Sequence, residues 1–249
     1  MIERPAGVQC RALEFSYAQA SETMRLDGSF AAGEVTAVLG PSGSGKSTLL
    51  NLIAGFASPL AGQVLFGGID MTGAPVGDRP VSMVFQENNL FAHLSVYQNV
   101  ALGVSPNLAL GQADRARVEE ALTSVGLAGY GSRRPAQLSG GERQRVALAR
   151  VVVRQRPVLL LDEAFSSLGP ALRGDMLDLL RKIQRERGMT AIMVTHFPDD
   201  ALRAASRVMF IESGTIIAAG PTAEILDAET APSRVRDYLG ANRSDRFEN

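Results

Sequence analysis

Short apolar runs alternate with amphipathic stretches along most of the chain. Runs of apolar and β-branched residues are typical of buried strands, and they occupy residues 35–39, 81–85, 158–161, 190–194 and 207–212. Apolar residues at helical spacing predict helices over residues 46–54, 112–125, 141–153, 171–187 and 198–205. This alternation of strands and helices favours an α/β fold built on a mostly parallel sheet.

The pattern changes in three places. Near the N-terminus, residues 8–17, 24–30 and 63–68 are more typical of antiparallel strands joined by turns. Between about 88 and 152 the pattern is helical without a good strand, which predicts a helical subdomain inserted into one domain spanning 1–249. The polar residues 229–249 predict a tail that frays.

Composition narrows the function classes without choosing one. The chain is 45% hydrophobic and 20% charged, enough for a sizeable core. A net charge of −1 gives no reason to expect a nucleic-acid partner. One cysteine, Cys10, excludes a disulfide framework. No signal-peptide pattern is visible, and no apolar run approaches the roughly 18 residues that cross a bilayer, so we expect a cytosolic chain.

A complete phosphate-binding motif follows the first core strand. The segment GPSGSGKST matches G-x-x-x-x-G-K-[ST] and comprises Gly40, Pro41, Ser42, Gly43, Ser44, Gly45, Lys46, Ser47 and Thr48. Its glycines let backbone N–H groups close around phosphates at a helix N-terminus. Lys46 would contact the β- and γ-phosphates, and the Ser47 hydroxyl would ligate Mg²⁺. Only Lys46 and Lys182 are lysines, so the presence of one of them inside this motif favours a functional role for it.

Two further strand ends carry polar side chains. In VLLLDE, Asp162 and Glu163 follow a buried strand, where Asp162 suits a Mg²⁺ contact and Glu163 could polarise the attacking water. A pair of solvated acids at a strand end is the alternative. In TAIMVTH, the strand ends at His196, which could donate to a γ-phosphate oxygen. A single histidine is more often structural, so only the other motifs support a functional role for His196.

A second glycine-rich helix start lies later in the chain. In LSGGERQRVALAR, Ser139 is predicted to cap a helix that begins with Gly140, Gly141 and Glu142. Such a start could hold a second anion. One nucleotide does not need two such sites from one chain, so the surplus indicates a site shared by two subunits.

Taken together, these motifs resemble the ATP-binding cassette of ABC transporters over about residues 8–228. The resemblance implies a RecA-like core, ATP and Mg²⁺ as ligands, and two copies packed head to tail with ATP between them. It implies that Gln86 senses Mg²⁺ and water and that Tyr17 stacks on adenine. The alternation of Tyr17 with Leu13 and Phe15 fits a half-buried strand equally well.

The resemblance also accounts for the segment after residue 85, which is polar and then apolar. It implies that Leu90, Phe91 and Leu94 help to form a groove for the permease subunit in the membrane, or else pack the helical subdomain. The chain would then lie peripherally on the cytoplasmic face of the cell membrane. A periplasmic or extracellular solute-binding protein would be an indirect partner.

The sequences of several segments are similar to those of the ATP-binding subunits of bacterial thiamine importers. ENNLF followed by HL, and then LGVSPNLAL, carry this narrower resemblance. Importers of polyamines, sulfate or iron remain alternatives, as does a soluble ABC ATPase of DNA repair or translation. A P-loop kinase or GTPase does not explain LSGGE.

Three positions depart from the family pattern. Glu142 ends the LSGGE signature where glutamine is commoner, which we expect to matter least. Gly169 stands where the loop after the catalytic glutamate usually ends in aspartate, and Ala164 replaces the usual proline. Glycine adds backbone freedom, so we expect Gly169 to weaken the coupling between two paired sites or to slow turnover, in a chain that is still an active ATPase.

Overall fold

The five predicted core strands form the centre of one sheet in the computed structural model, which describes residues 6–17, 23–85 and 89–244. They are β3 (Val35–Leu39), β6 (Val81–Phe85), β7 (Val158–Asp162), β8 (Thr190–Val194) and β9 (Arg207–Glu212). All four pairings among them are parallel, in the order β9-β3-β8-β7-β6. The carboxyl ends of β3, β7 and β8 therefore meet at one edge, where ligands bind in such sheets.

Five further strands extend the same sheet, and those within residues 8–17, 24–30 and 63–68 pair antiparallel as the sequence pattern predicts. They are β1 (Val8–Phe15), β2 (Met24–Phe30), β4 (Ala61–Phe66), β5 (Ile69–Asp70) and β10 (Thr215–Pro221). Within the described residues the full order is β5-β4-β1-β2-β10-β9-β3-β8-β7-β6. Strand β10 was not predicted. It forms a hairpin with β9 and joins the parallel strands to the antiparallel ones.

The central strands are buried on both faces because their side chains alternate between two hydrophobic clusters. In β7, Leu159 and Leu161 pack into the cluster with the helical insertion, α5 and α6, while Val158 and Leu160 pack into the cluster with α1, β1 and β2. Parallel strands covered on both sides read as continuous apolar runs, which is why the sequence pattern located them so well.

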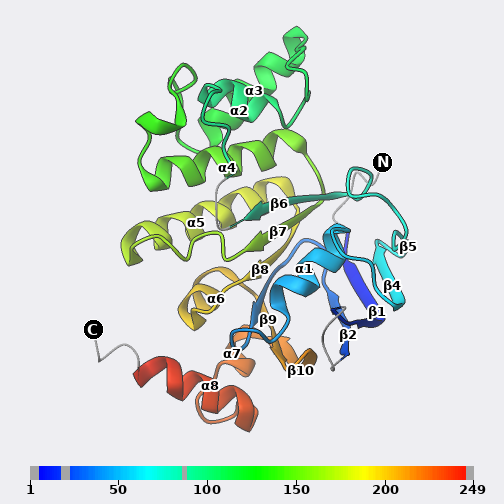
Figure 1. Cartoon of the computed structure of the whole chain (residues 1–249). Helices are drawn as coiled ribbons and strands as arrows, with labels where there is room; N and C mark the ends of the chain where they lie inside the picture. Colours follow the sequence, from blue (N-terminus) through cyan, green and yellow to red (C-terminus); the bar gives the residue numbers. More distant parts are fainter. Residues whose placement is uncertain (1–5, 18–22, 86–88, 245–249) are drawn as a thin grey trace.

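The five predicted helices are also confirmed. They are α1 (Lys46–Ala54), α3 (Gln112–Ser124), α4 (Gly140–Arg154), α5 (Pro170–Arg187) and α6 (Pro198–Ala204). The structure adds α2 (Val96–Ala101), η1 (Pro135–Gln137), α7 (Thr222–Ile225) and α8 (Ser233–Ser244). In Figure 1, α2, α3 and α4 form a layer beyond the sheet, with α5 between this layer and the strands. No strand occurs in described residues 89–154, although the boundaries 88–152 stay a prediction.

The fraying of residues 229–249 stays a prediction, although residues 233–244 are helical. These residues form α8, at the end of the chain that Figure 1 colours red. Val235 is completely buried, and Tyr238 packs edge-on against Phe210 of β9 with 5.1 Å between ring centroids. The few apolar residues of this polar segment gather on one face, and their contacts with the sheet lie outside what a local pattern shows.

Candidate functional site

The phosphate-binding motif forms the tight loop that the sequence predicts between β3 and α1. Gly40 has a φ of 145°, and a Cβ there would clash with the backbone carbonyl of Ile211. Only glycine fits this conformation without strain. The Lys46 side chain is buried, and its ammonium group donates hydrogen bonds of 2.8 Å to the carbonyls of Gly40 and Pro41. Two backbone carbonyls of the loop therefore fix the position of the Lys46 side chain.

A hydrogen bond joins this loop to the end of β7. The Ser47 hydroxyl donates to Asp162 Oδ1 at 2.8 Å, so two of the three predicted Mg²⁺ ligands lie together, the third being Gln86. Burial raises the pKa of the Asp162 carboxyl, and the hydrogen bond from Ser47 opposes that shift. Burial also lowers the pKa of Lys46, against the attraction of Glu163 and Asp162. The site thus brings a buried lysine close to two partly buried carboxylates.

Glu163 and His196 face each other across neighbouring strands. His196 Nδ1 lies 3.6 Å from Glu163 Oε2. Glu163 has a φ of 48°, which is uncommon outside glycine, and its N–H donates to the carbonyl of Val194 at 3.1 Å. The structure therefore brings together the two side chains that the sequence proposed for chemistry, one at the end of β7 and one at the end of β8.

A cavity of about 450 Å³ opens over the phosphate loop and Glu163, while Asp162 and His196 are not among its lining residues. Its lining includes residues 42–48 of the loop, Tyr17 and Glu163, together with Thr23, Met24, Ser213 and Gly214. The last four were missed by sequence reasoning. Ser213 and Gly214 form the turn between β9 and β10, and the Ser-Gly pair after an apolar strand is a turn signal that could have found them.

Tyr17 lines this cavity, and the residue is 57% exposed. Its hydroxyl shares a 2.7 Å hydrogen bond with the hydroxyl of Thr48, and its ring packs edge-on against Phe15. Strand β1 ends at Phe15, so the interpretation of Tyr17 as part of a half-buried strand is wrong. The exposed ring leaves a flat surface beside the phosphate loop.

The second glycine-rich helix start lies elsewhere. Ser139 caps α4 as predicted: its hydroxyl accepts from the Glu142 N–H at 3.3 Å, and its own N–H donates to Glu142 Oε2 at 2.7 Å. The hydrogen bonds from Ser139 lower the pKa of Glu142. The described residues that line the cavity over the phosphate loop do not include Ser139, Gly140, Gly141 or Glu142.

The segment after β6 is described only from residue 89, so Gln86 lies outside the described residues. Phe91 is 48% exposed, as a contact residue would be. Leu90 and Leu94 are half-buried, and Leu90 packs against the cluster that includes the helical insertion. The packing of Leu90 fits the alternative that this segment packs the helical subdomain, and the permease contact stays a prediction.

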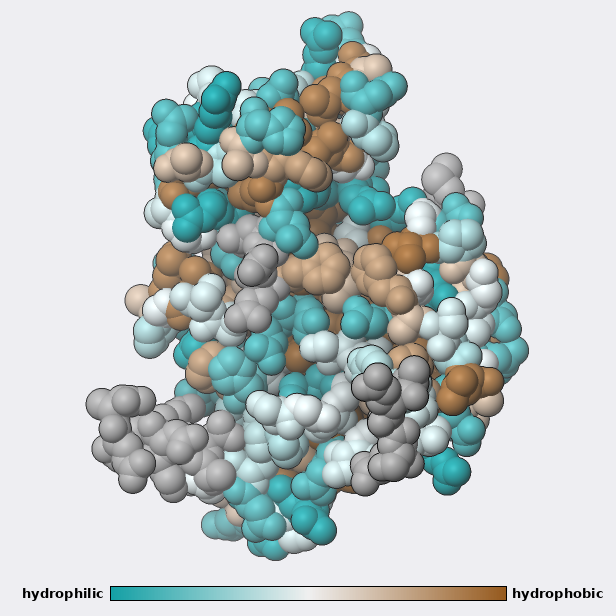
Figure 2. Space-filling view, in the orientation of Figure 1, coloured by the Kyte–Doolittle hydropathy of each residue, from teal (hydrophilic) through white to brown (hydrophobic). Residues whose placement is uncertain are grey.

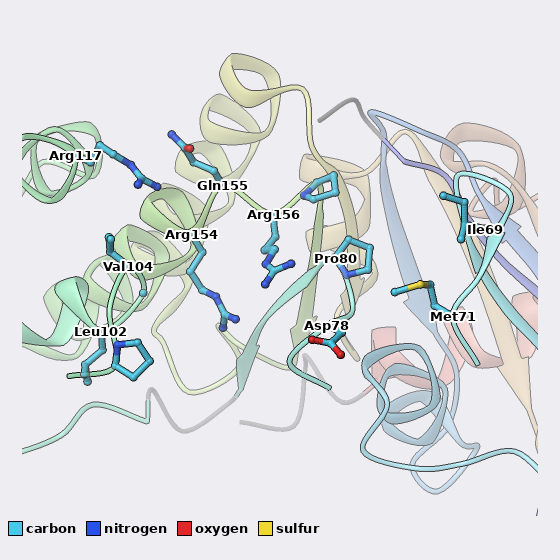
Figure 3. Close-up of a pocket in the computed structure, with 13 residues that line it drawn as sticks. Ile69, Met71, Asp78, Pro80, Leu102, Val104, Arg117, Arg154, Gln155 and Arg156 are labelled. Atoms are coloured by element: carbon cyan, nitrogen blue, oxygen red, sulfur yellow. The ribbon is translucent and has the colours of Figure 1, made fainter. Parts of the chain in front are cut away.

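A second cavity, of about 1110 Å³, lies between the helical layer and the strands (Figure 3). Its charged lining residues are Arg117, Arg154, Arg156 and Asp78, and its apolar ones include Ile69, Met71, Leu102 and Val104. In Figure 2, apolar side chains gather in the band where the helical layer meets the rest of the molecule. Burial lowers the pKa of Arg154, and the charge of Arg156 adds to this effect.

Residues 23–166 match the model of a protein family described as ABC transporter. This chain belongs to the ABC transporter family. The matched residues contain the phosphate loop, Ser139 and Glu163, so the predicted membership of this family is confirmed. Within residues 6–17, 23–85 and 89–244, no helix combines the length and apolarity needed to cross a membrane.

Two curated relatives align with nearly all of this ABC chain. A protein of Brucella abortus biovar 1 (strain 9-941) is 56% identical over 96% of this chain and 98% of its own length. A protein of Chelativorans sp. (strain BNC1) is 57% identical over 97% of each chain. Both are named thiamine import ATP-binding protein ThiQ.

Two solved structures share the fold. One is a dimeric post-hydrolysis state of the ATP-binding cassette MJ0796 bound to ADP and Pi, with a TM-score of 0.74 and 29% identity over 86% of this chain and 98% of the other. The second, a dimeric structure of MJ0796 described as a bacterial ABC transporter cassette, has a TM-score of 0.73 and 28% identity over the same shares of both chains. The predicted α/β cassette fold is thereby confirmed.

Proposed function

We propose that this chain is the ATP-hydrolysing subunit of an importer for thiamine. The observation that carries the ATPase role is the hydrogen bond between Ser47 and Asp162, which joins the phosphate loop to the edge where Glu163 and His196 meet. The solute follows from the names of relatives that align with almost the whole chain at 56–57% identity.

ATP would lie along the phosphate loop in the smaller cavity. The backbone N–H groups at the start of α1 and the Lys46 ammonium would bind the phosphates. The exposed ring of Tyr17 would stack on adenine, an arrangement worth about 0.5–1.5 kcal/mol for aromatic pairs. A neighbour of the same fold is bound to ADP and Pi, which supports nucleotide binding here.

Mg²⁺ fits the residues beside the phosphate loop. The Ser47 hydroxyl and the Asp162 carboxylate supply oxygen ligands, which Mg²⁺ prefers, and they already lie 2.8 Å apart. Gln86 is proposed as a third ligand, from the sequence alone. When bound, the ion would neutralise charge on the phosphate oxygens.

Glu163 would act as the general base and His196 as a hydrogen-bond donor to the γ-phosphate. Both side chains lie at carboxyl ends of strands beside the loop, and their reactive atoms are 3.6 Å apart. Glu163 would accept the proton of the attacking water, a step worth roughly 10²- to 10⁴-fold in rate. His196 would hold the phosphate while Glu163 holds the water.

A second copy of the chain would complete the site. Ser139, Gly140, Gly141 and Glu142 lie outside the cavity of their own chain, yet they form a helix start suited to an anion. Head-to-tail pairing would place them over the phosphate loop of the other copy. The dimeric cassettes among the structural neighbours support this arrangement.

The larger cavity is the proposed contact with the permease. It lies beside the helical layer, and its arginines outnumber its one acidic lining residue, Asp78, so it suits a permease segment with acidic side chains (Figure 3). Phe91, Leu90 and Leu94 would add apolar contacts. The chain would then lie on the cytoplasmic face of the membrane and reach the solute-binding protein only through the permease.

Uptake of labelled thiamine at low external concentration tests this function. The strains to compare are the parent, a strain lacking the gene, and that strain carrying either the wild-type gene or Lys46→Ala. Uptake lost in the deletion, restored by the wild type and not by the variant, would support both the ATPase role and the solute. Unchanged uptake in the deletion strain would remove thiamine and leave an importer of another solute to be sought.

Replacing Arg154 tests the permease contact separately. Arg154→Glu should reduce the amount of the chain that purifies with membranes, while the exposed Arg185→Glu serves as the matched control. Equal recovery of the two variants with membranes would contradict the proposed contact. ATP hydrolysis by each purified chain shows whether the nucleotide site is intact.

A further inference from the structure

We propose that Tyr238, in the C-terminal helix α8, is a positioning residue for His196. The inference rests on the proposed role of His196 at the γ-phosphate. The Tyr238 hydroxyl donates a hydrogen bond of 3.0 Å to the backbone carbonyl of His196. The two residues are 42 positions apart, so the last helix of the chain reaches the loop that carries the histidine.

Helix α8 is anchored well enough to hold this loop. Val235, one turn before Tyr238, is completely buried in the cluster that includes the helical insertion, and Leu239 packs against the same cluster. The Tyr238 ring meets Phe210 edge-on at 5.1 Å. Because Phe210 lies on strand β9 of the core sheet, the hydroxyl of Tyr238 is fixed relative to the sheet and not only to its own helix.

The opposite side of the loop is held by α5 and α6. Arg173 pairs with Asp200 at 3.2 Å and lies 3.8 Å from the centroid of the Phe197 ring, which in turn packs 3.9 Å from the His196 ring. Asp200 also accepts a 2.8 Å hydrogen bond from the Thr195 hydroxyl. These contacts hold the residues on either side of His196, while Tyr238 holds the carbonyl of His196 itself.

Removing the Tyr238 hydroxyl should therefore move the imidazole relative to Glu163 without altering the phosphate loop. Displacement of the His196 imidazole, as a hydrogen-bond donor, should destabilise the transition state more than it weakens the binding of ATP. The expected signature is a lower kcat with an unchanged KM for ATP. A purely structural role of α8 would change protein stability, not the ratio between these two constants.

Tyr238→Phe tests the inference because it deletes the hydroxyl and keeps the ring packed on Phe210. In the full-length chain we expect kcat for ATP hydrolysis to fall about threefold to tenfold, the range of one net hydrogen bond. KM for ATP should stay within about twofold. Tyr97→Phe is the matched control, since Tyr97 lies in α2 of the helical layer. An unchanged kcat in Tyr238→Phe would overturn the inference.

The histidine NMR signals give a second, independent readout. The chain contains two histidines, His93 and His196, and His93→Gln assigns their imidazole signals. Tyr238→Phe should shift the His196 signal and leave the His93 signal in place. A His196 signal that does not move would overturn the positioning role, whatever the change in kcat.

His196→Ala separates this inference from the proposed function. If His196→Ala hydrolyses ATP at the wild-type rate, the proposed role of His196 fails, and the role of Tyr238 fails with it. If His196→Ala is impaired while Tyr238→Phe matches the wild type, only the inference about Tyr238 fails.

Discussion

The phosphate loop lines the smaller cavity and the loop that carries His196 contacts its lining residue Glu163, but the two loops are held in different ways. The phosphate loop holds its lysine through contacts within a few residues, from Lys46 to the carbonyls of Gly40 and Pro41. The histidine loop depends on side chains from distant elements, which include Tyr238 in α8 and Glu163 after β7.

Because of this difference, we expect ATP binding and ATP hydrolysis to depend on different sets of residues. A loop held by its own backbone keeps its shape when distant residues change, so ATP affinity should depend on residues 40–48 and their immediate contacts. The arrangement of Glu163 and His196 should respond to changes elsewhere in the fold. Substitutions in the first group should alter nucleotide binding, and those in the second group should alter kcat alone.

The largest effect is expected for Lys46→Ala. The substitution removes the buried ammonium group that would contact the phosphates, so hydrolysis should fall by about 10²- to 10³-fold, and ATP binding should weaken with it. Lys182→Ala is the matched control because Lys182 is the other lysine of the chain and lies exposed on α5. Titration with a fluorescent ATP analogue measures the binding. Wild-type affinity in Lys46→Ala would contradict the assigned loop.

Asp162→Asn should lower activity and raise stability together. Loss of a Mg²⁺ ligand should reduce hydrolysis by about 10²-fold or more. Burial raises the pKa of Asp162, so at neutral pH its ionised form lowers the free energy of unfolding. The neutral amide still accepts from Ser47, and Tm should rise by about 2 °C at pH 7.

This stability gain should shrink as the pH falls through the raised pKa of Asp162, because the wild-type carboxyl then becomes neutral as well. Thermal unfolding of both proteins at pH 7 and in acid checks the sign. A gain that grows in acid would contradict the assigned pKa shift.

Gln144→Met probes a long-range contact of the catalytic edge. The buried Gln144 side chain donates a 2.6 Å hydrogen bond from α4 to the carbonyl of Ala164, the residue after Glu163. We expect kcat to fall about fivefold with unchanged ATP affinity. Gln184→Met is the control, since buried Gln184 donates to the carbonyls of Gly33 and Met189, away from the cavity. Equal losses of kcat in both variants would mean a general loss of stability.

The smallest effect concerns Gly169. It is the N-cap of α5 with a φ of −61°, a conformation open to any residue, and a Cβ there meets no other atom within 4 Å. The added backbone freedom expected at this position is therefore not used. Gly169→Asp should stabilise the chain as a helix cap by only a few tenths of a kcal/mol and raise Tm by about 1 °C. Gly169→Ala, which cannot cap the helix, is the control for calorimetry, and equal Tm values would contradict the capping effect.

Local patterns predicted the core strands, the helices and the phosphate loop because each is encoded within a few residues. Strand β10 and helix α8 were missed since their stability comes from partners far along the chain, such as β9 for the strand and Phe210 for Tyr238. For the same reason the sequence named Glu163 and His196 but could not show that they lie 3.6 Å apart. The roles of these residues stay predictions.

The most direct test of the account is the oligomeric state of Glu163→Gln with ATP. If hydrolysis needs Glu163 and Ser139 of a second copy closes the site, the Glu163→Gln chain should bind ATP without hydrolysing it. It should then accumulate as an ATP-bound dimer. We expect light scattering to report a dimer with ATP and Mg²⁺ and a monomer without nucleotide, and Ser139→Ala in the same background should weaken the dimer. A Glu163→Gln chain that binds ATP but stays monomeric at every concentration would contradict the account.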